Sequence, residues 1–254
     1  MTAACRLPDG FVLHAHDRLA STNDEALRLA EAGAPAGVVV SAGEQTRGRG
    51  RHGRTWASPP GNLYASVLLR PDCQMTVAAQ LSLVAGLALG EALVGLGPPD
   101  LNLQLKWPND ILIGGAKAAG ILIEGASDAA GRAAWVIVGS GVNVISCPQG
   151  TLYPATCLAR EGFATTLTPL AVLQAYLAEL DCWLGRWREA GFGAVRRAWL
   201  ARGFGLGGEI HLRLDRVEFK GRFLDLTDTG SLLLEQAGGR RREIAAGEVF
   251  YLDR

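Results

Sequence analysis

The 254-residue sequence has no excess of charge of either sign, because 25 Lys and Arg residues balance 25 Asp and Glu residues. A general nucleic-acid-binding protein carries a net basic surface, so this balance weighs against that class. The N-terminus has no basic segment followed by an apolar one, which argues against export. With 48% hydrophobic residues, the composition is that of a soluble globular chain with an ample core.

Cysteine is sparse and has no pattern. The five cysteines are scattered and never spaced as C-x-x-C: Cys5, Cys73, Cys147, Cys157 and Cys182. They indicate reduced thiols of a cytoplasmic protein and no disulfide framework or zinc site. His14 and His16 form an HAH pair without further metal-ligand types nearby, which favours an edge strand or a surface position.

The most apolar stretch, at 78–96, is long enough to raise the question of a membrane span. Gln80 and Glu91 interrupt it, and three glycines weaken it as an isolated helix in lipid. The stretch therefore predicts a buried core helix, and we expect no membrane association.

The polar and apolar pattern predicts mixed helices and strands. Short polar side chains at 21–24 begin a helix that ends near Gly33, and the periodicity at 168–202 predicts two helices divided near Gly191. β-Branched and apolar runs predict strands at 38–42, 63–69, 101–106, 111–113, 119–124 and 135–138.

A composition break at 203–208 separates this pattern from the C-terminal residues. Beyond the break, five short strands with turn residues between them predict a small β-barrel. We therefore expect two domains, a larger one at 1–203 and a barrel at 204–254.

The segment QTRGRGRHGRTW, at 45–56, contains four arginines among three glycines. Glycine lets the backbone approach a ligand closely, and each guanidinium offers a fork of donors that matches phosphate or carboxylate oxygens. The segment therefore predicts an anion-binding loop. On composition alone, a solvated basic loop or a nucleic-acid-binding patch remains an alternative.

The same glycines fit the G-x-G-x-x-G spacing of dinucleotide folds and nearly fit a P-loop. In both motifs the glycines open a helix whose first amides bind phosphate. Pro59, Pro60 and Gly61 prevent a regular helix here, and Arg54 stands where a P-loop has lysine. Both interpretations are therefore disfavoured.

A second segment, KWPNDILIGGAKAAGILIE at 106–124, places Asn109 and Asp110 in a loop and Lys117 just after a hairpin turn. A lysine at such a position is usually an exposed residue with no role in a site. Together, however, five motifs form a recognisable set: STN at 21–23, GRGRHGRTW at 48–56, KWPND at 106–110, KAAGIL at 117–122 and GSGVN at 139–143. In this order and spacing they resemble those of biotin protein ligases, also called biotin–[acetyl-CoA-carboxylase] ligases.

This resemblance implies an α+β fold: a catalytic domain similar to class II aminoacyl-tRNA synthetases, with a mixed sheet and flanking helices, and a C-terminal SH3-like β-barrel. It implies a ligase that adenylates biotin with ATP and Mg²⁺, and then transfers biotin to a lysine of a biotin carboxyl carrier protein. Only 20 residues precede Ser21, so we expect the monofunctional type without a DNA-binding domain. A homodimer through the sheet edge stays open.

The resemblance also implies the roles of individual residues. Lys117, Arg49 and Arg51 are the expected catalytic residues. Biotin would contact Ser21, Thr22, Asn23, Gln45, Gly48, Arg49, Gly50, Arg51, Lys117 and Gly120. The nucleotide would contact Arg54, Trp56, Asn109, Asp110 and Asn143. Mg²⁺ would arrive with ATP, and Asp110 is the candidate ligand if the protein contributes one.

Two alternatives accompany this hypothesis. A lipoate or octanoate protein ligase shares the fold and the adenylation chemistry, but a linear acyl chain needs no partners for a ureido group, so STN and Gln45 favour biotin. A nucleic-acid-binding protein using the arginine loop belongs to another class, and the neutral net charge argues against it. We further expect the arginine loop to be mobile and to close over the ligand as a lid.

Overall fold

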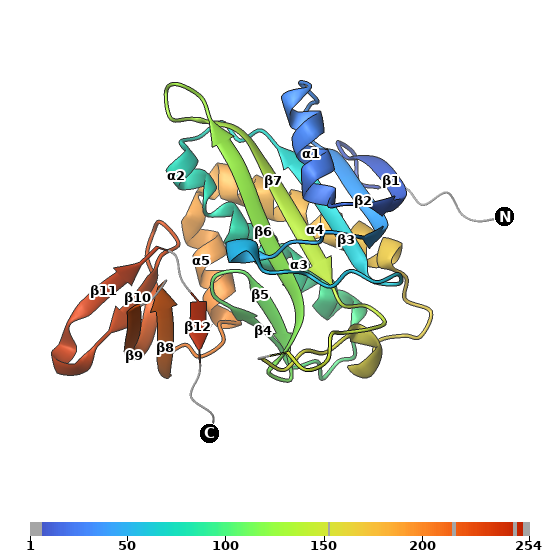
Figure 1. The fold of residues 1–254 in the computed structure, drawn as a ribbon. Helices are drawn as coiled ribbons and strands as arrows, with labels where there is room; N and C mark the ends of the chain where they lie inside the picture. The colour runs from blue at the N-terminus through green and yellow to red at the C-terminus, as the bar shows by residue number, and fades with distance from the viewer. Residues whose placement is uncertain (1–6, 152, 215–216, 246–247, 251–254) are drawn as a thin grey trace.

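The computed structural model describes residues 7–151, 153–214, 217–245 and 248–250, which form two sheets (Figure 1). Only β1 and β2 pair in parallel in the larger, seven-stranded sheet, and its other neighbours are antiparallel. Its strands, from edge to edge, are β1 (Val12–Leu19), β2 (Val38–Gln45), β3 (Leu63–Leu69), β7 (Ala133–Val142), β6 (Ala116–Ser127), β5 (Asp110–Ile113) and β4 (Leu103–Lys106). His14 and His16 lie on the edge strand β1.

Helices cover both faces of this sheet. On one face, α1 (Thr22–Glu31) packs on Val38 and Val40 of β2, whereas Val39, between them, joins the larger core on the other face. That core includes α3 (Leu81–Leu96), α4 (Pro169–Ala190) and α5 (Phe192–Ala201). Because side chains alternate along a strand, a strand covered on both faces must be apolar at successive positions, as β2 is.

The apolar stretch at 78–96 is a core helix, as the sequence predicts. It begins with a short turn, α2 (Met75–Ala78), and continues as α3. The segment Met75–Leu96 is long and apolar enough to cross a membrane, but 72% of its most apolar window is buried inside the protein. Gln80, between the two helices, accepts a hydrogen bond from Trp187 Nε1 of α4 at 2.7 Å.

The prediction of two C-terminal helices divided at Gly191 is confirmed. Gly191 lies between α4 and α5 with φ at 71°, a conformation that favours glycine. At the other end of the chain, α1 begins after Ser21, whose hydroxyl accepts the Asp24 amide, and Gly33 follows its end with φ at 84°.

The smaller sheet is a separate antiparallel unit of five strands, as expected for the residues after the composition break. In the part of the chain that the structure describes, no pairing joins its edge strands β11 and β12, so a closed barrel is not established. In order along the sheet, the strands are β11 (Arg241–Ile244), β10 (Leu232–Glu235), β9 (Val217–Leu226), β8 (Glu209–Leu214) and β12 (Glu248–Phe250).

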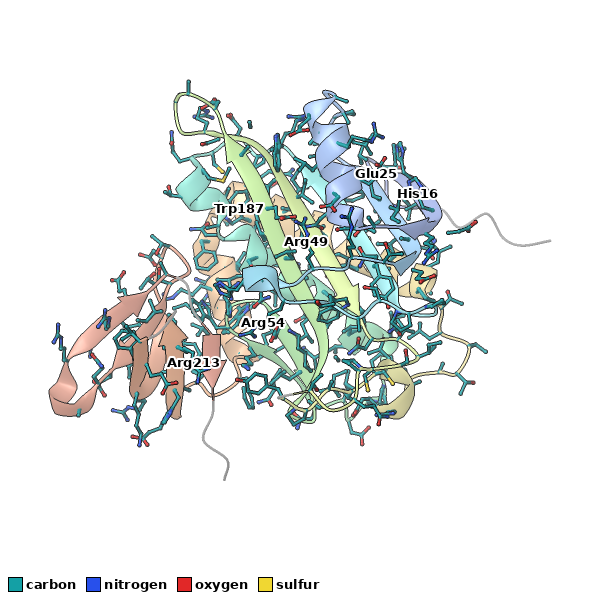
Figure 2. All side chains as sticks on the ribbon, viewed as in Figure 1. His16, Glu25, Arg49, Arg54, Trp187 and Arg213 are labelled. Carbon is teal, nitrogen blue, oxygen red and sulfur yellow. The ribbon has the colours of Figure 1, made fainter. Side chains whose placement is uncertain are left out.

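The turn between β9 and β10 attaches this sheet to the larger one. Gln80 Nε2 donates to Asp228 O at 2.9 Å, and Trp107 Nε1 donates to Gly230 O at 3.1 Å. Arg196 of α5 pairs with Asp225. Figure 2 shows Arg49 and Arg54 over the large sheet and Arg213 on the small one.

Candidate functional site

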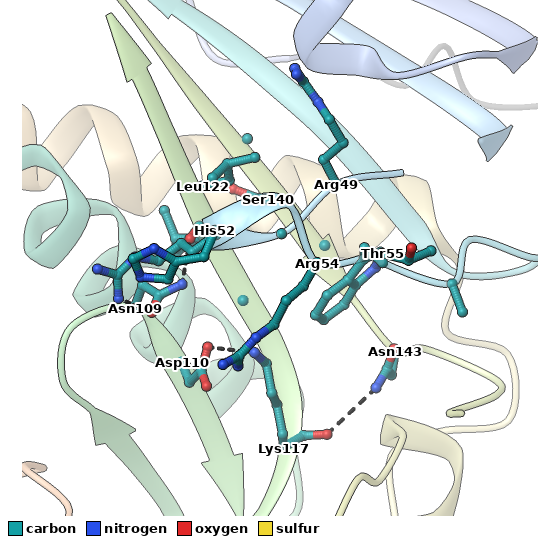
Figure 3. Close-up of a pocket in the computed structure, with 18 of the residues that line it drawn as sticks. Arg49, His52, Arg54, Thr55, Asn109, Asp110, Lys117, Leu122, Ser140 and Asn143 are labelled. Carbon is teal, nitrogen blue, oxygen red and sulfur yellow. Dashed lines mark hydrogen bonds and ion pairs between the residues drawn. The ribbon is translucent and has the colours of Figure 1, made fainter. Parts of the chain in front are cut away.

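A cavity of about 600 Å³ opens over the large sheet, between the arginine loop, the strands β4 to β7 and the residues Pro148, Thr151, Tyr153 and Ala155 (Figure 3). Its lining contains every candidate residue except Gly48: Ser21, Thr22, Asn23, Gln45, Arg49, Gly50, Arg51, Arg54, Trp56, Asn109, Asp110, Lys117, Gly120 and Asn143. Residues from five distant motifs therefore meet at one place.

Glycines form the floor of the cavity. Gly120 of β6 is the direct partner of Gly141 on β7, and Gly139 lies opposite Leu122. A Cβ atom on Gly141 would lie 2.7 Å from the Trp56 ring, and one on Gly139 would collide with Asn23 Oδ1. The missing side chains thus let Trp56 and Asn23 lie directly on the sheet. The sequence motifs point to Gly120 but give no sign that Gly139 and Gly141 have this function.

A network of hydrogen bonds, mostly between uncharged side chains, orders one end of the cavity. Gln45 Oε1 accepts from Thr22 N at 2.8 Å and from Thr22 Oγ1 at 3.1 Å, while Gln45 Nε2 donates to Ser58 Oγ at 3.0 Å. Asn23 Nδ2 donates to Glu124 Oε2 at 2.7 Å, and Ser66 Oγ lies 2.6 Å from Asn23 Oδ1. Because these groups are largely buried and mutually bonded, they are held in fixed positions.

Three members of this network, Ser58, Ser66 and Glu124, are absent from the sequence-based site. Ser66 is fully buried between apolar residues of β3, and a lone hydroxyl in such a strand is a signal that could have been read. Glu124 is 101 positions from Asn23, and no local pattern predicts that contact.

At the other end of the cavity, Lys117 Nζ lies 2.6 Å from Asp110 Oδ1 and 5.3 Å from the centroid of the Trp56 ring. The backbone of Lys117 is fixed by two hydrogen bonds, from its N–H to Pro154 O at 2.8 Å and from Thr156 N to its carbonyl at 3.0 Å. Asp110 begins strand β5, so the expected loop position is wrong for this residue. It pairs with Lys106 across the hairpin that KWPND starts.

The arginines of the loop point in different directions (Figure 3). Arg54 extends towards Lys117 and Asp110, and Arg51 donates to Asn109 Oδ1 at 3.4 Å. Arg49 points away from Lys117, and its guanidinium lies 2.6 Å from Asp24 Oδ1 and 3.2 Å from Glu124 Oε2. Arg49 takes this direction because the carboxylates of Asp24 and Glu124 attract its guanidinium and offset its charge. Although both are expected catalytic residues, the side chains of Arg49 and Lys117 do not point towards each other (Figure 3).

The loop itself is compact. Gly50 N donates to Arg54 O at 2.7 Å, Trp56 N donates to Gly48 O at 2.9 Å, and a 3₁₀ turn spans Arg51–Gly53. His52 has φ at 55°, an uncommon conformation for a residue with a side chain. No α-helix follows the glycines before β3, in agreement with the rejection of a dinucleotide motif and a P-loop.

Two buried asparagines fix the backbone beside the cavity. Asn143 Nδ2 donates to Thr156 O at 3.0 Å and to Lys117 O at 3.5 Å, so its amide holds the segment that carries Lys117. Asn62 Oδ1 accepts from three successive amides, those of Val144, Ile145 and Ser146, at 2.9, 3.0 and 3.2 Å. Asn62 was not among the expected site residues.

Two buried tyrosines near the site, Tyr64 and Tyr176, are not acid–base groups at neutral pH. Burial raises the pKa of Tyr64 to about 12, and its hydroxyl donates to Pro59 O at 2.8 Å. Burial likewise raises the pKa of Tyr176, whose hydroxyl accepts from Ser140 Oγ at 3.2 Å. The charged groups that line the cavity include the arginines, Lys106, Lys117 and Asp110.

Comparisons with known proteins agree with the geometry. The family model described as the biotin/lipoate A/B protein ligase family matches residues 7–201, and the model of the biotin protein ligase C terminal domain matches residues 205–252. A biotin–[acetyl-CoA-carboxylase] ligase of Paracoccus denitrificans is 40% identical over 92% of this chain and 98% of its own length. The bifunctional ligase/repressor BirA of Bacillus subtilis is 35% identical, over 91% of this chain and 71% of its own length.

Among solved structures, the biotin protein ligase of Aquifex aeolicus in complex with biotin and ATP aligns with a TM-score of 0.79 and 31% identity. The alignment covers 94% of this chain and 97% of that one. Since two family models together match most of the chain and a relative is 40% identical over nearly its whole length, the chain belongs to the biotin protein ligase family.

Proposed function

We propose that this enzyme joins biotin to ATP, forming biotinyl-5′-AMP and pyrophosphate, and then transfers biotin to a lysine of a biotin carboxyl carrier protein. The observation that carries the proposal is the division of one cavity into two ends. Neutral hydrogen-bonding groups are fixed at one end, around Thr22 and Gln45. Cations gather at the other end, around Lys117 and Arg54.

The neutral end suits the uncharged fused rings of biotin. Such a ligand needs an apolar surface and a few placed hydrogen bonds, which the glycine floor and the polar network supply. Ser21, Thr22, Asn23 and Gly120 are the proposed contacts. Both ends of the Gln45 amide already bond within the protein, so we assign Gln45 chiefly to orienting Thr22.

The cationic end suits the first reaction step. A carboxylate oxygen of biotin attacks the α-phosphorus of ATP, and the bond to the bridging oxygen breaks, so that its electron pair leaves with pyrophosphate. Both reactants are anionic, and catalysis requires that they be held together while charge builds on the phosphate. We assign that task to Lys117 and Arg51, with Arg54 and Trp56 on the nucleotide side.

In the second step, the neutral amine of the carrier lysine attacks the carbonyl carbon of the mixed anhydride. The bond to the phosphate oxygen breaks, AMP leaves with the electron pair, and the nitrogen loses a proton. Asn143 supports both steps through the backbone of Lys117. We further propose that the arginine loop closes over the anhydride and excludes water from it, with Gly48 and Gly50 allowing its backbone to approach.

Magnesium fits the site as a companion of ATP. Asp110 offers a carboxylate and Asn109 an amide oxygen at the cavity, and Mg²⁺ prefers one or two such ligands in addition to phosphate and water. Among the described residues, no group of three or more His, Cys, Asp or Glu forms a cage for an ion. When bound, Mg²⁺ would neutralise charge on the β- and γ-phosphates.

We extend the proposal to the finer architecture. Residues 1–203 would form a catalytic domain of the class II synthetase type, and residues 204–254 would form an SH3-like barrel. The composition break and the five-stranded order support this division. The family relationship supports a carrier domain of a cytoplasmic carboxylase as the acceptor. The strand β1 is an exposed edge strand, and we propose that a homodimer forms through it.

The decisive experiment is exchange of labelled pyrophosphate into ATP, measured with biotin and with lipoate in parallel. We expect exchange to depend on biotin and to remain at background with lipoate, because a linear chain leaves the polar end of the cavity unpaired. Exchange supported equally well by lipoate would contradict the assignment of biotin. Exchange with neither acid would contradict the proposed chemistry itself.

A second expected result concerns the position of Arg49. Asp24→Asn removes one of the two charges that hold this guanidinium away from Lys117. If Arg49 must move to meet the carboxylate of biotin, the variant should bind biotin more tightly, by up to about fivefold, the scale of one exposed ion pair. Calorimetric titration with biotin measures the change.

The matched control is Glu25→Gln on the same helix, because Glu25 pairs with Arg28 and has no contact with the loop. It should leave biotin affinity unchanged. Unchanged or weaker binding in Asp24→Asn would show that Arg49 is not recruited to biotin.

A further inference from the structure

Lysine is rare in this chain, and its placement is informative. Of the 25 basic residues only three are lysines, at positions 106, 117 and 220, and the rest are arginines. Two of the three, Lys106 and Lys117, line the cavity. A compact ammonium and a planar guanidinium are not interchangeable where a cation must fit among phosphate oxygens. In a chain that otherwise uses arginine, a lysine beside the cavity indicates a requirement for ammonium.

Lys106 lies in line with the groups already assigned to the reaction. It is the last residue of β4 and the direct cross-strand partner of Asp110 on β5, so the two side chains share one face of the sheet. Asp110 in turn pairs with Lys117 of β6. The three strands thus present a row of alternating charge, Lys106, Asp110 and Lys117, along one side of the cavity.

The ammonium of Lys106 is held close to the segment that closes this side. Its Nζ lies 4.9 Å from the centroid of the Tyr153 ring, and Tyr153 lines the same cavity. Next to Tyr153, Pro154 O accepts the amide of Lys117. A charge above an aromatic face is stabilised there without losing its ability to donate to an anion.

We propose that Lys106 binds the β- and γ-phosphates of ATP, an assignment that rests on the proposed function. Lys117 meets the α-phosphate, and Asp110, which lies between the two lysines, would offer an oxygen to the Mg²⁺ that accompanies ATP. When the bond between the α-phosphorus and the bridging oxygen breaks, the electron pair passes to pyrophosphate. Lys106 then stabilises the charge on this leaving group and transfers no proton.

The test compares two nucleotides that differ only beyond the α-phosphate. Binding of a non-hydrolysable ATP analogue with Mg²⁺ and binding of AMP are measured by calorimetry for the wild type and for Lys106→Met. We expect the dissociation constant of the triphosphate to rise about tenfold or more, as for a lost hydrogen bond to a charged group. AMP and biotin should bind within about twofold of the wild type.

Lys106→Gln provides a second, polar variant in case methionine disturbs folding, and the thermal melting of each variant is measured alongside. Tyr153→Phe keeps the aromatic face and should leave triphosphate affinity unchanged. Lys220→Met, on the small sheet, removes the remaining lysine at a distance from the cavity and should behave as wild type. In pyrophosphate exchange, the Lys106 variants should raise the KM for ATP and leave the KM for biotin unchanged.

An equal loss of AMP and triphosphate binding would overturn the proposal and assign Lys106 to holding Tyr153 in place. Unchanged triphosphate binding in both variants would overturn it as well. Either result is distinguishable from failure of the proposed function, because that failure would appear in the wild type as the absence of biotin-dependent exchange.

Discussion

Replacing Lys117 with alanine should lower the rate of biotin-dependent pyrophosphate exchange roughly a hundredfold or more, the usual cost of losing one group that stabilises a transition state. Lys117 Nζ is in the cavity beside Asp110, and its backbone is fixed on both sides, so the ammonium is positioned before the substrates arrive. Binding of biotin alone should change much less, because that interaction gains its main benefit while charge develops on the phosphate.

Two further variants make the result specific. Lys117→Arg retains the charge but replaces a compact ammonium with a planar fork, and we expect it to remain well below the wild-type rate. Lys220→Ala breaks only an exposed pair with Glu209 and should be normal. A near-normal rate in Lys117→Ala would remove Lys117 from the mechanism without changing the family assignment.

Gly139→Ala should weaken biotin binding about tenfold or more, although glycine itself offers the ligand no side chain. The added methyl group would collide with the amide of Asn23, which lies directly on the floor of the cavity. Asn23 would have to rotate and leave its hydrogen bonds to Ser66 and Glu124. We expect overpacking to lower the free energy of unfolding as well, by about 1–3 kcal/mol.

Gly86→Ala is the matched control, because Gly86 is also buried but lies in helix α3 with no atom within 4 Å of an added Cβ. Alanine favours the helical state, so this variant should be at least as stable as the wild type, by up to ~1 kcal/mol. Calorimetry with biotin and thermal unfolding of both variants check the pair. Normal biotin affinity in Gly139→Ala would mean that Asn23 does not contact biotin.

The sequence correctly predicted those structural features that depend only on residues close together in the chain. The cap at Ser21, the glycine between α4 and α5 and the hairpin before Lys117 all follow from residues close together in the chain. The position of Asp110 was missed because Pro108 and Asn109 indicate a loop, whereas pairing with β4 and β6 brings Asp110 into a strand. Tertiary pairing outweighed the local preference.

For the site, too, the sequence predicted what local motifs determine and missed what depends on tertiary contacts. The motifs predicted which residues meet at the cavity, because each carries chemistry that suits an anion or a neutral ring. They did not predict the direction of Arg49, which depends on Glu124, a residue 75 positions away. Nor did they predict Asn62, which orders three amides more than 80 positions later in the chain. Contacts of this kind arise only when the fold is formed.

The junction between the two sheets couples their stability. Gln80 uses its amide to join Trp187 of α4 to the β9–β10 turn, and Trp107 bonds that turn from the position next to Pro108. If the small sheet separated, the buried donors of Gln80 and Trp107 would lose their partners. The two units are therefore expected to melt as one cooperative body, so that loosening the C-terminal sheet disturbs the strand turn that carries Asn109.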